Sequence, residues 1–477
     1  MTLPHFNPLV AGEWVEVSDS ESIESPFSEQ ALATIGLAGF PEIEEATAAA
    51  ARSFEQTRGL PSYARAEILR QVSDAIGGDA TEFVSAIMAE GGKPLQFAQG
   101  EVERARLTFR LASEEVHRFG GEVLPLDVEP RATDYRGHWI RVPRGPVLAF
   151  TPFNFPLNLV AHKMAPAMAL GCPIVLKPAP QAPTAALHLA GLILDAGWPP
   201  EAISVLPCGL EQAQQLVSDE RFTTFSFTGS DRVGWMLREK AGRKRTLLEL
   251  GGNAAAVVHA DADLEQAAQR LAFGSFAHAG QVCIKVQRVF VQEAVYEELV
   301  GRFVEASRQL PVGDPGLPET VVGPLIDRRA ADRVESWIEE AIQMGARSLL
   351  RGDRKGNVLG PTILEAVPSE SRVACEEVFG PVTLVEPYGK WEDALERVNE
   401  TPYGLQAGLF TRDVDRIHQA IDRLDVGGIV VGDVPTFRVD SMPYGGVKRS
   451  GLGREGLRFA MEEMSEIRMV IYRQGYR

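Results

Sequence analysis

The chain of 477 residues is poor in cysteine and has none of the patterns that a disulfide framework or a metal site requires. Its cysteines stand at 172, 208, 283 and 375, without a Cys-x-x-Cys pair or a His–Cys cluster at metal-ligand spacing. We therefore expect neither disulfides nor a bound metal. A reducing cytoplasm is the compartment that fits, because an isolated reactive thiol stays reduced there.

Long apolar runs, a secretory leader and a basic excess are missing as well. The most apolar stretch, 157–176, is interrupted by Asn158, His162, Lys163 and two prolines, so no membrane span is expected. The first eight residues lack a basic region followed by an apolar one, so no signal peptide is expected. The formal charge of −17 argues against nucleic acid or an anionic membrane as a partner.

What is present is the composition and periodicity of an α/β protein. Hydrophobic residues make up 45% and charged residues 24% of the chain, which is typical of a soluble globular protein, and the length predicts two or three domains. A β-like opening over 9–18 precedes several helices over 42–119. Short apolar segments then alternate with helical ones from about 141 to 240, and again from about 251 to 432. This alternation predicts two doubly wound parallel sheets.

Two further segments have β character. Residues 122–142 are β-like, and the tail 466–473 alternates apolar and polar side chains. Together they predict a small β arm that pairs with another chain. The alternative is that the tail is an edge strand of its own domain.

The signal for a nucleotide is unusual, because no Gly-x-Gly-x-x-Gly follows a predicted strand. Instead Gly229 and Gly234, within 225–234, stand at a strand-to-helix turn whose backbone amides would bind a pyrophosphate. Lys177, at the carboxyl end of another strand, would meet the ribose or a phosphate. The alternatives are a purely structural turn and a lysine on a solvent-exposed loop.

Three more side chains suit attack on a carbonyl carbon. Cys283 follows a Gly-Gln turn, where amides would stabilise a thiolate, although free cysteines usually behave as small buried hydrophobes. Glu249 ends an apolar strand before two glycines, which suits a mobile base with a raised pKa; the alternative is a surface glutamate. Asn154, among prolines and aromatics, is either an amide donor or a turn former.

In chain order, seven runs resemble the aldehyde dehydrogenase superfamily from about residue 10 to the C-terminus. They are Thr-Pro-Phe-Asn-Phe-Pro at 151–156, Lys-Pro-Ala-Pro at 177–180, Phe-Thr-Gly-Ser at 227–230, Glu-Leu-Gly-Gly-Asn at 249–253, Gly-Gln-Val-Cys at 280–283, Glu-Glu-Val-Phe-Gly-Pro at 376–381 and Pro-Tyr-Gly-Gly-Val-Lys-Arg-Ser-Gly at 443–451. Within this superfamily, the chain resembles the branch of lactaldehyde, non-phosphorylating glyceraldehyde-3-phosphate and phosphonoacetaldehyde dehydrogenases. The resemblance implies NAD(P)-dependent oxidation of an aldehyde to the free carboxylic acid.

The resemblance also implies a role for each matching residue. Cys283 would be the nucleophile that forms a thiohemiacetal and then a thioester. The amide of Asn154 would help to hold the oxyanion, Glu249 would activate the hydrolytic water, and Lys163 would support the site electrostatically. Glu377 would hold the nicotinamide ribose. The implied cofactor-binding residues are Phe153, Lys177, Pro180, Gly229, Ser230, Gly234, Glu377 and Phe379.

The same resemblance implies a Rossmann-like cofactor domain, a catalytic domain and an oligomerisation arm. The cofactor domain is expected at 1–120 and 142–248, and the catalytic domain at 249–442. The arm is expected at 121–141 and 460–477, and a homodimer or homotetramer would follow from it.

Two departures from the family pattern bear on the chemistry. Pro180 stands where NAD-preferring members often have a glutamate for the adenosine ribose, so a 2′-phosphate is tolerable and we lean towards NADP or dual use. Arg232 would meet that phosphate unless it is an ordinary helix-surface arginine. Lys285, two residues after Cys283, would either lower the pKa of the thiol or point away, and we prefer the second reading.

The substrate is expected to be a small polar or anionic aldehyde. Asn158 and His162 would give the pocket a polar wall, and Phe437 and Arg438 would lie near its entrance on the loop 433–442. Arg104 and Arg110, on one predicted helix, would read a carboxylate or phosphate. The alternative is that all three arginines are structural or solvated. Phe155 and Tyr444 complete the expected substrate residues.

Three competing functions remain open at this point. A CoA-acylating semialdehyde dehydrogenase would lack the base, whereas Glu249 is present. A cysteine esterase or thioesterase without nucleotide would leave Lys177 and Glu377 without a role. A non-catalytic relative such as a lens-type crystallin would not need the whole set of residues.

Overall fold

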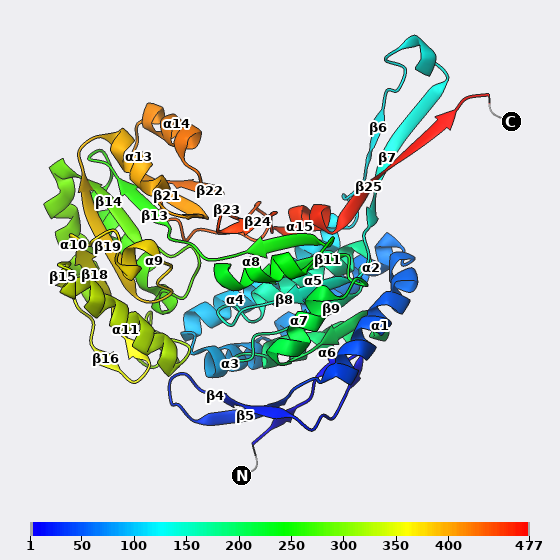
Figure 1. Cartoon of the computed structure of the whole chain (residues 1–477), viewed down its shortest axis with the longest axis horizontal. Helices are drawn as coiled ribbons and strands as arrows, with labels where there is room; N and C mark the ends of the chain where they lie inside the picture. Colours follow the sequence, from blue (N-terminus) through cyan, green and yellow to red (C-terminus); the bar gives the residue numbers. More distant parts are fainter. Residues whose placement is uncertain (1–2, 476–477) are drawn as a thin grey trace.

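Two separate sheets, both mainly parallel, form the framework of the molecule in the computed structural model, which describes residues 3–475. In Figure 1 the second sheet and its helices lie at the left, the first sheet lies at the centre, and a thin β arm projects at the upper right. The predicted α/β class with two doubly wound sheets and a small arm is confirmed.

The first sheet has five parallel strands whose spatial order reverses at its middle. These strands are β8 (Val147–Phe150), β9 (Ile174–Lys177), β10 (Ile203–Val205), β11 (Thr224–Thr228) and β12 (Arg245–Glu249). Their order is β12-β11-β8-β9-β10, so β8 and β11 are neighbours although two strands separate them in the chain. A ligand of an open α/β sheet binds beyond the carboxyl ends of strands at such a switch point.

Short antiparallel strands close both edges of this sheet. They are β24 (Gly451–Leu452) beside β12, and β2 (Leu9–Val10) with β3 (Glu13–Trp14) beside β10. The β-like opening predicted for 9–18 is therefore broken after two residues. The reason is a turn in which Ala11 and Gly12 both have positive φ angles, 50° and 84°. Near the N-terminus, β1 (His5–Phe6), β4 (Ser20–Glu24) and β5 (Ala31–Gly36) form a separate small sheet.

Helices cover both faces of the first sheet, and one of them is completely buried. The helices are α1 (Phe40–Arg58), α2 (Ser62–Gly78), α3 (Ala80–Gly91), α4 (Leu95–Glu115), α5 (Asn158–Leu170), α6 (Thr184–Asp195), α7 (Leu210–Ser218) and α8 (Asp231–Lys240). Every residue of α5 is buried, because α2, α4 and α15 (Leu457–Glu463) pack around it. Its polar side chains must therefore find partners inside the protein. Among residues 3–475, no helix combines the length and apolarity needed to cross a bilayer.

The second sheet has six parallel strands with one antiparallel strand at its edge. In spatial order its strands are β15 (Arg347–Leu350), β18 (Thr362–Glu365), β19 (Val382–Tyr388), β14 (Arg288–Gln292), β13 (Ala255–Val258), β21 (Gln406–Phe410) and β22 (Gly428–Val431). Its main helices are α9 (Leu264–Phe276), α10 (Tyr296–Arg308), α11 (Arg328–Gln343), α13 (Trp391–Asn399) and α14 (Val414–Arg423). The chain passes from the first sheet to the second directly after Glu249, through Gly251 and Gly252.

The arm is a three-stranded antiparallel sheet made of β6 (Glu122–Leu124), β7 (Tyr135–Pro143) and β25 (Ser465–Arg473). The tail strand β25 pairs with β7 along its whole length and with neither main sheet. The arm predicted from 460 begins as a strand only at Ser465, because α15 occupies the preceding residues and packs on α5. Residues 476 and 477 of that prediction lie outside the described residues. Pairing with another chain stays a prediction.

Candidate active site

A cavity of about 400 Å³ lies at the switch point of the first sheet and faces the second. The segment after β8 contributes 152–155, the segment around the end of β11 contributes 228–231, and the end of β12 contributes 249–251. The second half of the chain adds, among others, 282–284, 376–377, Phe379 and three residues between 436 and 444. The cavity therefore lies between the carboxyl ends of neighbouring parallel strands of the first sheet and residues from the second half of the chain.

Cys283 enters this cavity on a strained turn. The short 3₁₀ helix Ala277–Gly280 before it contains His278 and Ala279, both with a φ of 53°. Left-handed backbone at two successive non-glycine residues is rare and persists only where surrounding contacts fix it. Gln281 supplies such contacts, because its side-chain oxygen accepts from the N–H of Ile326 at 2.9 Å. Burial raises the pKa of the Cys283 thiol to about 11, so the thiol is neutral at rest.

Asn154 is held against the same turn. Its Nδ2 donates to the carbonyl oxygen of Gln281 at 2.9 Å, two residues before Cys283. Asn154 is itself buried. One hydrogen of the Nδ2 group is engaged in this bond and the second remains for another acceptor. The amide is thus fixed beside the thiol rather than free in a turn.

Glu249 is a buried carboxylic acid without a hydrogen-bond partner. Neither of its side-chain oxygens has a partner among the described residues, and the residue is 3% exposed. Burial, and then repulsion from the carboxylate of Glu455, raises its pKa well above the ordinary value. Gly445 makes room for it, since a Cβ at that position would stand 2.7 Å from Oε1. The raised pKa makes the carboxylate of Glu249 a stronger proton acceptor than an ordinary glutamate, which suits a general base.

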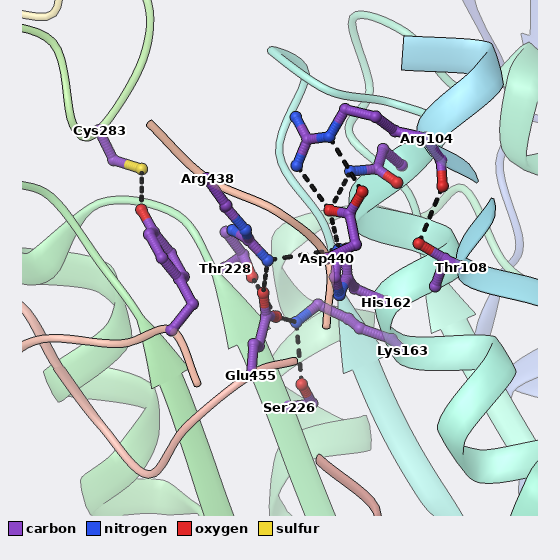
Figure 2. Close-up of polar contacts among 12 residues, drawn as sticks. Arg104, Thr108, His162, Lys163, Ser226, Thr228, Cys283, Arg438, Asp440 and Glu455 are labelled. Atoms are coloured by element: carbon purple, nitrogen blue, oxygen red, sulfur yellow. Dashed lines mark hydrogen bonds and ion pairs between the residues drawn. The ribbon is translucent and has the colours of Figure 1, made fainter. Parts of the chain in front are cut away.

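Behind Glu249 lies a buried charge network that contains two cations and one anion. Oε1 of Glu455 is 3.0 Å from Nζ of Lys163, and Oε2 is 3.1 Å from Nη2 of Arg438. Lys163 also donates to Oγ of Ser226 at 2.9 Å. Burial alone would raise the pKa of Glu455, but the two cations lower it, so this carboxylate stays ionised. Figure 2 shows Lys163 and Arg438 converging on Glu455 from different elements.

A second buried carboxylate, Asp440, gathers three donors beside the cavity. Its Oδ1 lies 2.6 Å from Nη2 of Arg104, 2.7 Å from Nε2 of His162 and 3.3 Å from Nδ2 of Asn158. Its Oδ2 accepts from Nε of Arg104 at 3.0 Å, so this guanidinium is bound bidentately (Figure 2). Burial would raise the pKa of Asp440, but the bonds from His162 and Arg104 lower it far below its usual range.

Another group of residues that line the cavity has the features of a dinucleotide site. Helix α8 starts at Asp231, directly after Gly229 and Ser230, and the first amides of a helix have no acceptor within it. The ring of Phe379 lies 5.9 Å, edge to face, from that of Phe153. Oε1 of Glu377 accepts from the N–H of Gly252 at 3.0 Å, and burial raises the pKa of Glu377 to about 7. Anion-binding amides, an aromatic wall and a ribose acceptor fit a nicotinamide dinucleotide.

The aldehyde dehydrogenase family model matches residues 14–470 of the chain. The chain belongs to the aldehyde dehydrogenase family. A relative named 3-sulfolactaldehyde dehydrogenase, from Priestia aryabhattai, is 41% identical over 467 residues and covers 98% of both chains. The predicted class of NAD(P)-dependent aldehyde oxidoreductase is thereby confirmed.

Solved aldehyde dehydrogenases share the whole fold. Aldehyde dehydrogenase 21 from Physcomitrella patens, in complex with the reaction product succinate, has a TM-score of 0.97 at 38% identity and covers 100% of this chain and 99% of its own. Glyceraldehyde-3-phosphate dehydrogenase from Methanocaldococcus jannaschii, complexed with NADP, has a TM-score of 0.92 at 38% identity and covers 96% and 100%. These neighbours support the expectation of NAD or NADP as cofactor.

The structure gathers most of the predicted site residues of this aldehyde dehydrogenase in one cavity. Those that line it are Cys283, Glu249, Asn154, Phe153, Gly229, Ser230, Glu377, Phe379, Phe155, Asn158, Arg104, Arg438 and Tyr444. Lys163 stands one layer behind, in contact with Glu455. Arg438 is not at an entrance as predicted but buried, with its side chain 9% exposed.

Three predicted substrate residues do not line the cavity. His162 is buried behind Asn158, because Asp440 binds its ring. Phe437 is exposed, and the loop turns its backbone instead towards Gln406, whose Nε2 donates to the Phe437 carbonyl at 2.8 Å. Arg110 lies on the solvent side of α4, 3.9 Å from Glu114. For His162 and Arg110 the predicted position is wrong, whereas the place of Phe437 near the entrance stays a prediction.

Three residues predicted for the nucleotide also lie outside this cavity. Lys177 ends β9 and pairs in register with Phe150 of β8, while Pro180 lines a separate hollow of about 300 Å³. Gly234 lies within α8, where an added Cβ would stand 2.4 Å from a methyl carbon of Leu250, so it has a packing role. Lys285 points away from the thiol, as preferred, and donates to the carbonyl oxygen of Val382 at 2.6 Å.

The sequence predicts no role for Glu455 or Asp440. Both are single acidic residues on irregular segments, and their partners Lys163 and His162 lie about three hundred positions earlier in the chain. The only local signal for Glu455 is its position among the glycines of 451–456.

Proposed function

We propose that this aldehyde dehydrogenase oxidises a small anionic or polar aldehyde to the free acid, with Cys283 as nucleophile and Glu249 as base. The observation that supports this most directly is the unpaired, buried carboxyl of Glu249 in the same cavity as the neutral thiol of Cys283. A base whose pKa is raised and a thiol that must lose a proton suit one another chemically.

In the first half of the reaction Cys283 attacks the aldehyde carbon. The thiol first passes its proton to Glu249, the resulting thiolate then forms the S–C bond, and the carbonyl oxygen becomes an oxyanion. The free hydrogen of the Asn154 amide and the backbone N–H of Cys283 are the donors placed to hold that oxyanion. When bound, the nicotinamide supplies the hydride acceptor that turns the thiohemiacetal on Cys283 into a thioester.

In the second half Glu249, which has by then released the thiol proton to solvent, takes a proton from a water molecule. The resulting hydroxide attacks the thioester carbon, the C–S bond breaks, and the thiolate of Cys283 regains a proton from Glu249. The acid leaves as a free carboxylate. Lys163 and Arg438 keep Glu455 ionised behind the base, and the charge of Glu455 in turn keeps the proton affinity of Glu249 high.

The nicotinamide nucleotide would be held by residues from both halves of the chain. Glu377, Phe379 and Phe153 would bind the nicotinamide riboside, and Gly229 and Ser230 at the start of α8 a phosphate. Lys177, Pro180 and Gly234 belong to the adenosine end of this proposal. Pro180 leaves no carboxylate against a 2′-phosphate, and Arg232 is exposed on the first turn of α8, so we lean towards NADP or dual use.

Two guanidinium groups favour an anionic aldehyde. Arg104 and Arg438 both line the cavity. Asp440 fixes Nε and Nη2 of Arg104, which leaves Nη1 for a ligand. The names of the relatives agree with this chemistry, since sulfolactaldehyde and glyceraldehyde 3-phosphate are small anionic aldehydes.

Replacing Arg104 by methionine is expected to raise KM for 3-sulfolactaldehyde about 10–100-fold, the worth of one charge-assisted hydrogen bond. KM for lactaldehyde, which lacks the sulfonate, is expected to change little. Steady-state kinetics on both aldehydes measures the difference. Arg110→Met, on the solvent side of the same helix, is the matched control. Equal losses for the two aldehydes would contradict anion recognition by Arg104.

One assay separates the proposed function from its rivals. Absorbance of the reduced nicotinamide is followed with NAD or NADP, with and without CoA, over anionic, neutral polar, long alkyl and aromatic aldehydes. We expect turnover without CoA and the highest kcat/KM on small anionic aldehydes. A requirement for CoA would favour the acylating enzyme. Ester hydrolysis without nucleotide reduction would favour the esterase, and a preference for long alkyl aldehydes would contradict the substrate proposal.

The same proposal assigns a function to each domain of the chain. We assign 1–120 and 142–248 to cofactor binding and 249–442 to catalysis, and 121–141 with 460–477 to an arm for a homodimer or homotetramer. The arm supports this by exposing Ile467, Met469 and Ile471 of β25. An isolated three-stranded sheet with exposed apolar residues suits a subunit contact. A cytoplasmic location fits the need of Cys283 to stay reduced.

A further inference from the structure

The sulfur of Cys283 has one hydrogen-bond partner among the described side chains, and the mechanism above does not use it. The hydroxyl oxygen of Tyr444 lies 2.9 Å from Sγ. In Figure 2 the dashed line from Cys283 marks this contact. Tyr444 is 3% exposed and lines the proposed active-site cavity, so its hydroxyl has little access to bulk water. A buried phenol of this kind is expected to bond a group of the protein or a ligand.

The protein fixes Tyr444 from both its backbone and its ring. The backbones of Tyr444 and Glu455 form an antiparallel bridge, with N–H to carbonyl distances of 3.0 and 2.7 Å. The ring packs in a small apolar cluster with Ile284 and Leu405. Rotation of the phenol away from the sulfur would disrupt these contacts. The hydroxyl is therefore preorganised at Sγ.

A positive charge lies directly on the ring. The guanidinium carbon of Arg438 is 3.8 Å from the ring centroid of Tyr444, and Glu455 holds that guanidinium through its ion pair. A cation against an aromatic face withdraws electron density from it. A phenol O–H polarised in this way is a stronger donor to an anion. The guanidinium of Arg438 thus contacts the ring of Tyr444, whose hydroxyl in turn contacts the thiol of Cys283.

We propose that Tyr444 is a further catalytic residue, whose hydroxyl donates a hydrogen bond to the thiolate of Cys283 once the thiol proton has left for Glu249. The inference rests on the proposed role of Cys283 as nucleophile. The phenol keeps its own proton throughout, because burial, and then the neighbouring thiolate, raises the pKa of Tyr444 above its ordinary value. The same bond lowers the pKa of Cys283 against the effect of burial. The thiolate leaves the phenol when the S–C bond forms.

The competing interpretation is that Tyr444 only fills space. Phenylalanine would then serve equally well, because the ring contacts with Ile284 and Leu405 do not involve the oxygen. Tyr444→Phe removes the hydroxyl and keeps those contacts. Its effect on the thiol itself, measured without substrate, decides between the two interpretations.

The test is the rate at which iodoacetamide alkylates Cys283 in the full-length protein at pH 8, read from the labelled peptide by mass spectrometry. Only the thiolate reacts, so the rate follows the thiolate fraction. Losing a hydrogen bond to a charged group is expected to slow alkylation about 10-fold or more in Tyr444→Phe. Tyr388→Phe, a buried tyrosine of the second sheet, is the control and should react like the wild type. Alkylation of Tyr444→Phe at the wild-type rate or faster would overturn the proposal.

Aldehyde oxidation by the same proteins separates this proposal from the proposed function. If the wild type oxidises aldehydes and Tyr444→Phe shows no slower alkylation, the role of Tyr444 is wrong and the function stands. If the wild type oxidises no aldehyde while Tyr444→Phe is alkylated more slowly, the contact with the thiolate stands and the function is wrong. Thermal unfolding of both tyrosine variants checks that the fold is retained.

Discussion

Replacing Cys283 by alanine is expected to abolish aldehyde oxidation, with kcat lower by about 10⁴-fold or more, because the alternative is direct attack by water without a covalent intermediate. The cavity contains no second thiol: Cys172 and Cys208 are buried in the core around the first sheet, and Cys375 is exposed. Formation of the reduced nicotinamide measures the loss. Nucleotide binding is expected to persist, which fluorescence titration with NADP checks.

Cys375→Ala is the matched control for that variant. It removes a free thiol two residues before Glu377, at the end of the short helix Arg372–Cys375, and its sulfur lies outside the cavity lining. Full activity is expected. Retention of more than a few per cent of wild-type kcat by Cys283→Ala would contradict the assignment of the nucleophile, whatever the behaviour of Cys375→Ala.

The framework was predictable from the sequence because its signal is local. Strand-length apolar segments such as 147–150 and 174–177 alternate with helices, and the two sheets follow from that alternation. Asn154 follows strand β8, and Glu249 ends strand β12, both at the carboxyl edge of the first sheet. Cys283 follows a turn that faces the same edge. Topology brings such positions together without any detailed knowledge of packing.

The charge networks could not be predicted in the same way. Helix α5 is buried on every side, so no polar face distinguishes Asn158, which lines the cavity, from His162, which does not. Both side chains bond Asp440, which lies on a distant irregular segment, and only the tertiary structure places Asn158 at the cavity and His162 one helical turn away from it. The burial of Arg438 likewise depends on Glu455. A buried guanidinium is stable only when an ion pair compensates the loss of its hydration. Pairings between remote residues leave no periodic trace in a single sequence.

Glu249→Gln is expected to separate acylation from hydrolysis. Glutamine keeps the shape of the side chain but accepts no proton, so steady-state turnover should fall about 10²–10⁴-fold, the usual range for loss of a general base. A burst of reduced nicotinamide of about one equivalent per site should remain. It is measured best by stopped flow at pH 9, where a larger thiolate fraction lets acylation proceed with less help from the carboxylate.

The pH dependence of hydrolysis tests the same base in the wild type. Glu249 acts when deprotonated, and burial with repulsion from Glu455 raises its pKa. Hydrolysis should therefore be slow below that raised pKa, increase as pH rises through it, and level off above it. Glu249→Gln should lose this inflection. Hydroxylamine should restore turnover in the variant, because a strong external nucleophile attacks the thioester of Cys283 without a base. Wild-type turnover by Glu249→Gln, or the absence of both the burst and the rescue, would contradict the proposed base.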